Sequence, residues 1–172
     1  VQLVLRSIII SVVSLLIIVI PVADNAISTL AESYMRDVCD TCGLNVDAAL
    51  NRSGNIILNQ AYLETLIGDV CINDLDSSYA YVVGSDGTMI YHPDESKVGQ
   101  PVENAPIKQV VADLEAGKEQ QKGMAIYEFR GAEKYAAYYV TSNKAAILVI
   151  TADRGDILSA KDVIYVRAVS AA

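Results

Sequence analysis

The chain has 172 residues, of which 13 are basic and 21 are acidic, so its net charge at pH 7 is −8. A net negative chain without a run of Lys and Arg lacks the surface that binds phosphate backbones, which excludes nucleic acid as a partner. Charged residues make up 20% and hydrophobic residues 52%, too apolar for a disordered chain and enough for a compact core.

The N-terminal segment is the most hydrophobic part of the sequence. Ser7 to Ala23 carry no charge, and about 20 helical residues reach the roughly 30 Å of a bilayer core. We interpret residues 1–23 as a transmembrane helix rather than a signal peptide, because Val22-Ala23-Asp24 is a poor cleavage site. Arg6 before this segment and Asp24 after it favour an N-terminus inside the cell and a following region outside it.

Apolar residues at helical spacing continue beyond the predicted span. This stripe consists of Ile27, Leu30, Tyr34, Val38 and Cys42. It predicts a helix from about Asp24 to Leu50 that is continuous with the span, so that movement at one end is felt at the other. Because one small sheet cannot cover the whole stripe, we also predict parallel helix pairing near the membrane, in a homodimer.

Three cysteines, Cys39, Cys42 and Cys71, follow in the predicted outer region. The pair Cys39-Asp-Thr-Cys42 has the C-x-x-C spacing of redox and metal motifs, but no second pair follows and the single histidine, His92, is distant in sequence. A zinc site would need a fourth ligand that no motif identifies. We therefore expect no metal and no cofactor, and the pair either packs as small apolar side chains or forms a local disulfide.

The apolar pattern changes from helical to alternating at about residue 79. A weaker helical pattern over Asn55 to Ile67 and a polar stretch come before it. Two alternating runs, Tyr79 to Gly84 and Thr88 to His92, flank Asp86-Gly87, a strong hairpin signal that places Tyr81 opposite His92.

A loop from Pro93 to Pro106 and a short amphipathic helix from Ile107 to Glu115 lead to three further predicted strands. These strands are Met124 to Arg130, Lys134 to Thr141 and Ala146 to Thr151. A hairpin and a meander form antiparallel sheets, so we predict an α+β domain whose sheet has one face covered by the N-terminal helix. The other face is then available for a pocket.

The strand region carries a specific motif. Asp86-Gly87 is followed by His92-Pro93 in the pattern D-G-x-x-x-x-H-P, and the pattern V-G-x-P-V follows at Val98 to Val102. With Tyr127-Glu-Phe, Lys134-Tyr-Ala-Ala-Tyr and Ile147 to Asp153, this region resembles the Cache domain of bacterial chemoreceptors from about Tyr79 to Leu158. The preceding span and long helix suit a methyl-accepting chemotaxis protein.

The resemblance implies a PAS-like, five-stranded extracytoplasmic sheet at the plasma membrane of a bacterium, which binds a small molecule and signals to cytoplasmic modules. It divides the chain into the span (1–23), helical segments (24–78), the sensor sheet (79–158) and a C-terminal helix (159–172) that leads toward a second, truncated span. The amino-acid signature of Cache domains includes Trp, and this chain has none. A small polar metabolite such as a short carboxylate is therefore favoured as the ligand.

Tyrosines on the predicted strands are the main candidates for ligand contacts, because each offers an apolar wall and one hydroxyl donor. A turn at Gly131-Ala132 places Tyr127 and Phe129 on the face of Lys134, Ala136 and Tyr138, while Ile126, Glu128 and Arg130 lie on the other face. The predicted ligand-binding residues are Tyr81, His92, Tyr127, Tyr138 and Asp153. The alternatives are a core role for each tyrosine, a turn anchor for His92 and a helix cap for Asp153.

Catalytic chemistry has little support in the sequence. There is one histidine, no G-x-S-x-G motif and no Gly-rich phosphate loop, so no catalytic residue is predicted and the chain is not expected to be an enzyme. Two other sensor classes stay open, those of membrane histidine kinases and of diguanylate cyclases. A redox protein or secreted enzyme built on Cys39 and Cys42, and a structural or protein-binding ectodomain without a ligand, are the remaining alternatives.

Overall fold

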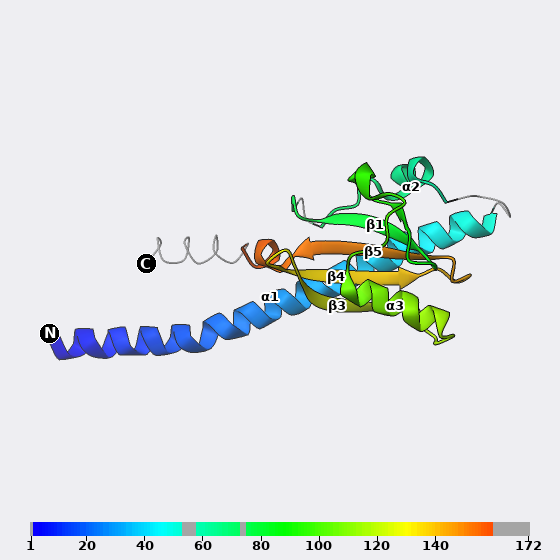
Figure 1. The fold of residues 1–172 in the computed structure, drawn as a ribbon. Coiled ribbons are helices and arrows are strands. Elements are labelled where there is room, and N and C mark those ends of the chain that lie inside the picture. Colours follow the sequence, from blue (N-terminus) through cyan, green and yellow to red (C-terminus); the bar gives the residue numbers. More distant parts are fainter. Residues whose placement is uncertain (1, 53–57, 73–74, 160–172) are drawn as a thin grey trace.

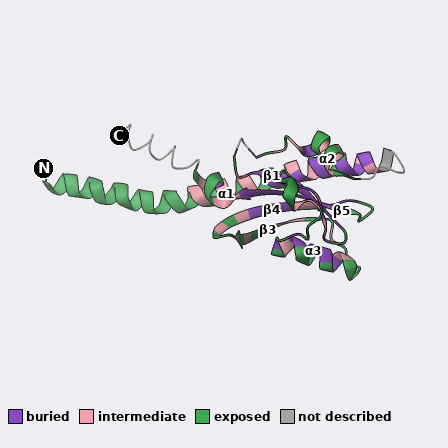
Figure 2. Cartoon of the chain, turned by 45° about the horizontal axis from the view of Figure 1, so that its top comes forward, coloured by how far each residue is buried: buried purple, intermediate pink, exposed green. Residues whose placement is uncertain are grey.

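The N-terminal part of the molecule is one continuous helix. The computed structural model describes residues 2–52, 58–72 and 75–159, and the first of these ranges is α1 (Gln2–Arg52), a helix of 51 residues. Its first part projects away from the sheet with residues 2–22 all exposed, whereas its second part lies along the sheet (Figures 1 and 2). Among the described residues, α1 is the helix that is long and apolar enough to cross a bilayer.

Five antiparallel strands form one sheet in the order β2-β1-β5-β4-β3. Their bounds are β1 (Tyr79–Gly84), β2 (Met89–Tyr91), β3 (Lys122–Phe129), β4 (Ala132–Val140) and β5 (Ala146–Asp153). The predicted α+β class and the five antiparallel strands are confirmed. β2 is shorter than the predicted Thr88 to His92 at both ends, because Thr88 forms an isolated bridge with Pro101 and the chain leaves the ladder at His92.

The β1–β2 hairpin closes at the predicted Asp86-Gly87 turn. Gly87 has a φ of 81°, and the Asp86 carboxylate accepts a hydrogen bond of 2.9 Å from the Thr88 amide. The register shifts between Val82 and Val83, which pair with Tyr91 and Met89. Because Val82 pairs with Tyr91, the adjoining residues Tyr81 and His92 lie across from each other, with ring centroids 5.9 Å apart.

The face of the sheet that we call the helix face is covered by the second half of α1 and by α2 (Gln60–Ile67). Met35, Cys39 and Val46 of α1 are buried there against Leu148 and Ile150 of β5. The Cys39 and Cys42 thiols are free and buried, and burial raises both pKa values. Both cysteines thus belong to the apolar packing of this core.

The opposite face, the pocket face, is covered over part of its length by α3 (Ala105–Glu115). Ile107, Val110 and Val111 of α3 pack on Val83 and Ile147 of the sheet. The loop that leads to α3 contains the short helix η1 (Glu95–Lys97) and runs along β2, with the Met89 amide donating to the Gln100 carbonyl at 2.8 Å. This loop and α3 leave one end of the face uncovered by a helix (Figure 1).

Two predicted helices extend beyond what the structure describes. α2 begins at Gln60 with Asn59 as its cap, and the predicted residues 55–57 lie outside the described residues. Residues 154–159 are helical and follow β5 directly. The rest of the C-terminal helix predicted over 159–172, which leads toward a second, truncated span, lies outside the described residues as well.

Candidate functional site

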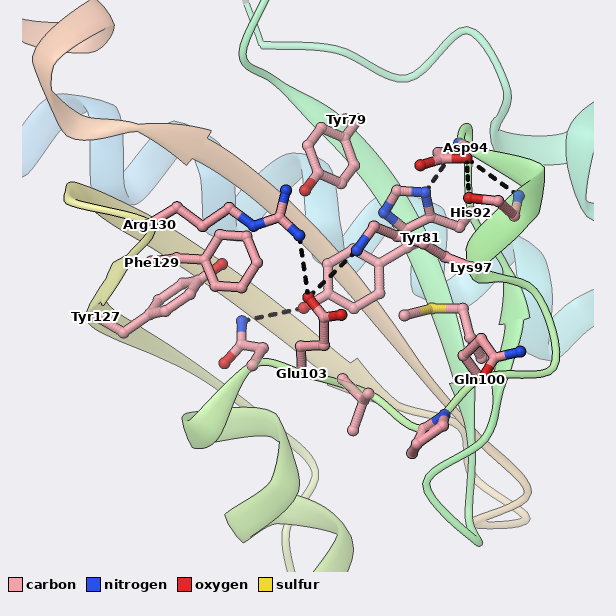
Figure 3. A pocket seen from close by; sticks show the side chains of 15 residues that line it. Tyr79, Tyr81, His92, Asp94, Lys97, Gln100, Glu103, Tyr127, Phe129 and Arg130 are labelled. Carbon is pink, nitrogen blue, oxygen red and sulfur yellow. Dashed lines mark hydrogen bonds and ion pairs between the residues drawn. The ribbon is translucent and has the colours of Figure 1, made fainter.

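A cavity of about 410 Å³ opens on the pocket face, at the end of the sheet where β1 begins and β3 ends. Its walls come from β1, the end of β2, the loop before α3, and the end of β3 with the turn that follows (Figure 3). Two groups of side chains stand out among them: aromatic rings on or next to the strands, and charged groups on the loop and the turn. Its volume is sufficient for a small metabolite.

Aromatic rings form the wall on β1. Tyr79 and Tyr81 are two residues apart on one strand and so face the same side, with ring centroids 6.2 Å apart. The His92 ring lies 5.1 Å from Tyr79 in an edge-on arrangement. Burial raises the pKa of Tyr79 to about 12 and that of Tyr81 well above its ordinary value of 10, so both hydroxyls stay protonated and able to donate.

The Tyr81 and Tyr127 hydroxyls are both held by hydrogen bonds, and the bond to Tyr81 leaves its hydroxyl proton free to donate. The Tyr81 oxygen accepts a bond of 3.1 Å from the Asn104 side chain, which is buried. The Thr151 hydroxyl on β5 donates to the Tyr135 carbonyl, so the Tyr127 hydroxyl, 3.3 Å from it, donates its proton to Thr151. Asn104 also accepts a bond from the Ile107 amide and so caps α3. The pocket wall and the first turn of α3 are therefore joined through one side chain.

His92 is fixed at its backbone and at its ring. The Gln60 side chain of α2 donates to the His92 carbonyl and accepts from the His92 amide, both at 3.1 Å. The Asp94 amide donates to His92 Nδ1 at 2.9 Å, so the neutral ring carries its proton on Nε2. Burial, with a smaller contribution from Lys97, lowers the pKa of His92 below its ordinary 6.5. At neutral pH His92 is thus an uncharged donor.

Three charged side chains meet at the cavity mouth. The Glu103 carboxylate lies 3.2 Å from Lys97 Nζ and 3.9 Å from an Arg130 nitrogen. The Arg130 guanidinium also stacks over the Phe129 ring, 5.1 Å from its centroid. Figure 3 shows Glu103 between the two cations, which approach from the loop and from the β3–β4 turn. The mouth therefore contains two cations that share one carboxylate.

The structure brings together three of the five predicted site residues. Tyr81, His92 and Tyr127 line the cavity. Tyr138 lies on the same sheet face outside the cavity and donates to Gln120 at 2.8 Å. Asp153 also lies outside the cavity, where its carboxylate pairs with Lys134.

Sequence reasoning did not identify Lys97, Glu103, Asn104 and Arg130 as site residues. Continued strand alternation placed Arg130 on the opposite face, and that expectation is wrong. Arg130 has a φ of 53°, which ends the alternation and turns the side chain to the mouth. The other three belong to a loop, whose path no periodicity predicts; the adjoining V-G-x-P-V motif was the only available signal.

Metal chemistry finds no support in the part of the chain that the structure describes. There, no three His, Cys, Asp or Glu side chains are arranged to hold a metal ion. The cavity is lined by two cations, Lys97 and Arg130, by two carboxylates, Asp94 and Glu103, and by an aromatic wall with neutral hydroxyl and imidazole donors. The cations and the neutral donors suit non-covalent binding of a small anionic molecule.

Comparison with known proteins identifies the fold. No protein family and no curated protein matches this sequence. A solved structure described as "Structural basis for carboxylic acid recognition by a Cache chemosensory domain" matches with a TM-score of 0.54 and 15% identity, over 76% of this chain and 97% of that one. The fold is thus that of a Cache chemosensory domain, as the motif resemblance implied.

Two further solved structures are similar at lower scores. They are the extracellular domain of the putative histidine kinase mmHK1S-Z3 (TM-score 0.47, 16% identity, 59% of this chain) and the periplasmic sensory domain of the Campylobacter jejuni chemoreceptor Tlp1 (0.44, 20%, 56%). This chain spans 38% of the first and 35% of the second.

Proposed function

We propose that this chain is the extracytoplasmic sensor region of a transmembrane chemoreceptor and that it binds a small carboxylate in the pocket described above. The observation that carries the proposal is the convergence of two cations, Lys97 and Arg130, with the neutral donors Tyr81 and His92 at one aromatic cavity. Charge-assisted hydrogen bonds from such cations are about twice as strong as neutral ones, and a carboxylate has acceptor sites for all four groups.

The proposed contacts divide between anchoring and charge recognition. Tyr81 and His92 would donate from the rigid wall, since Asn104 and Gln60 already hold them. Tyr127 would close the side of the cavity near β3. Recognition of carboxylic acids by the solved Cache domain of the same fold supports this ligand class.

The position of the pocket suggests a route for the signal. The cavity lies at the sheet end where β5 runs into residues 154–159, and these residues approach α1. We propose that the ligand favours one of two arrangements of these helices. A change from 1:99 to 99:1 would require about 5.5 kcal/mol of differential binding.

Ile27 and Ile157 line one apolar groove, which makes them suitable for a crosslinking test of this route. With exposed Cys71 changed to Ser, the double variant Ile27→Cys, Ile157→Cys should crosslink at a rate that changes when saturating carboxylate is added. Identical rates in both conditions would contradict the two-state route.

Pairing of two copies along α1 is a separate proposal. Leu30 and Tyr34 are exposed on α1 just beyond the predicted span, and they belong to the stripe that we expect to pair. Light scattering of the full chain in detergent micelles should give a dimer, and Leu30→Glu should shift it toward monomer. A chain that stays monomeric at high concentration would contradict the pairing.

The test of ligand class is a thermal-shift screen of the full 172-residue chain in micelles with acetate, propionate, lactate and neutral analogues. A ligand at one hundred times its dissociation constant adds about 2.7 kcal/mol, which raises the melting temperature by several degrees. Tyr81→Phe and His92→Ala should each lower affinity by about 1 to 3 kcal/mol.

Tyr138→Phe is the matched control for this screen, because it removes the same hydroxyl from the same sheet face outside the cavity. Its affinity should equal that of the unmodified chain. A screen without any carboxylate hit, or unchanged affinity in both pocket variants, would contradict the proposed site.

A further inference from the structure

Glu103 occupies the position where a carboxylate would bind. Its side chain is the shared partner of Lys97 and Arg130, from two separate elements, at 3.2 and 3.9 Å. In Figure 3 its carboxylate lies between them, inside the ring of lining side chains. The chain therefore satisfies its own two cations with its own carboxylate.

We infer that Glu103 is an internal competitor that a carboxylate ligand must displace, and that it thereby sets both the affinity and the charge selectivity of the pocket. This inference rests on the proposed function. Two carboxylates cannot share the same pair of cations without mutual repulsion, because like charges a few ångströms apart disfavour each other. An anion that enters the mouth therefore replaces Glu103.

Displacement is feasible because the Glu103 pairs are largely in contact with water. The Glu103 side chain is 55% exposed and that of Arg130 is 73% exposed, while Lys97 is 27% exposed. Exposed ion pairs contribute little to stability, since water and salt screen them. The competitor therefore lowers ligand affinity moderately and does not abolish binding.

Selectivity follows from the same competition. A neutral isostere of the ligand cannot take the place of Glu103, because an amide makes no ion pair with Lys97 or Arg130. A carboxylate restores both interactions at the moment it removes Glu103. The pocket should thus discriminate anions from neutral molecules of equal shape.

The test is calorimetric titration of the full chain in micelles with sodium propionate and with propionamide. Glu103→Gln should bind propionate about three- to tenfold more tightly than the unmodified chain, because the competitor loses its charge. Glu103→Asp keeps the charge on a shorter side chain that reaches the cations less well, so its affinity should lie between the two.

The matched control is Glu95→Gln, which removes the same charge from the neighbouring helix η1, where Glu95 makes no side-chain bond among the described residues. Its propionate affinity should change by less than twofold. If Glu103→Gln bound propionate no more tightly than the unmodified chain, Glu103 would not be a competitor. The same conclusion would follow if Glu95→Gln increased propionate affinity as much as Glu103→Gln does. Propionate binding itself would stand in both cases. Failure of propionate to bind any of the four proteins would instead overturn the proposed function and this inference together.

Discussion

The two faces of the sheet are built from alternate residues of the same strands, yet helices of very different length cover them. The second half of α1 lies along the helix face, whereas α3 has 11 residues and spans only about 16 Å. A strand of nine residues such as β4 spans about 30 Å. The helix face is therefore closed and mostly apolar, while part of the pocket face remains open to a loop, water and ligand.

The difference between the two faces shows that the site lies where α3 leaves the pocket face uncovered. On the helix face, Leu148 and Ile150 meet apolar side chains of α1, and no polar group is needed. On the pocket face, the end beyond α3 is lined by Tyr79, Tyr81 and His92, which carry polar atoms that a ligand can satisfy. Substitutions on the two faces should accordingly differ in whether they change stability or binding.

The largest expected effect is loss of packing on the helix face. Leu148→Ala removes a fully buried side chain and should lower the free energy of unfolding by about 3 kcal/mol. Leu44→Ala on α1, where the side chain is 59% exposed, should change it by less than about 1 kcal/mol. Urea denaturation of both chains in micelles measures the difference. Equal losses would mean that α1 does not close this face as described.

The next effect concerns the polar contact at the far end of the helix face. The Asp47 carboxylate is buried and accepts bonds from the Tyr139 hydroxyl and the Ser142 amide, at 2.9 and 2.8 Å. Asp47→Ala should cost about 2 kcal/mol because it leaves these donors without their charged acceptor. Asp37 is exposed on the same helix, so Asp37→Ala is the control and should leave the free energy of unfolding nearly unchanged. If Asp47→Ala also weakened propionate binding, the two faces would not be independent.

A smaller effect is expected where the pocket face meets α3. Asn104→Ala should cost about 1 to 2 kcal/mol, because it removes the α3 cap and the bond to Tyr81. Asn104→Ser keeps a capping oxygen but is too short to reach Tyr81, so it should recover part of the stability. Melting temperatures of Asn104→Ala and Asn104→Ser measure the difference between the two variants. Identical stabilities of these variants would mean that the cap contributes nothing here.

The smallest effect is a pH dependence from the pocket face. Burial lowers the pKa of His92 below its unfolded value of about 6.5, so the unfolded chain binds a proton that the folded chain does not. Stability is therefore fully present above pH 6.5 and declines as the pH falls through 6.5 toward the folded pKa.

His92 is the single histidine, so this window is free of other imidazoles. His92→Gln should flatten the stability profile between pH 7 and 5, measured by urea denaturation. A profile that keeps its slope in this variant would assign the titration to another group.

The strands could be predicted because alternation is a local property. Asp86-Gly87 and Gly131 fixed the turns, and the faces of Tyr127, Phe129 and Tyr138 followed from counting residues away from them. The same counting failed at Arg130, where a left-handed residue ends the strand. Asp153 was chosen by its place after the predicted end of the last strand, but β5 continues to it and Lys134 takes its carboxylate.

By itself the sequence determined the apolar helix, the α+β class and the antiparallel order of turns and strands, because periodicity and turn chemistry act over a few residues. Only the tertiary structure decided which residues share a cavity. Lys97, Glu103 and Arg130 meet because a loop folds back on β2 and the β3–β4 turn reverses the chain beside it. The loop and the turn are about 30 residues apart in the sequence. A contact between segments so far apart leaves no local pattern.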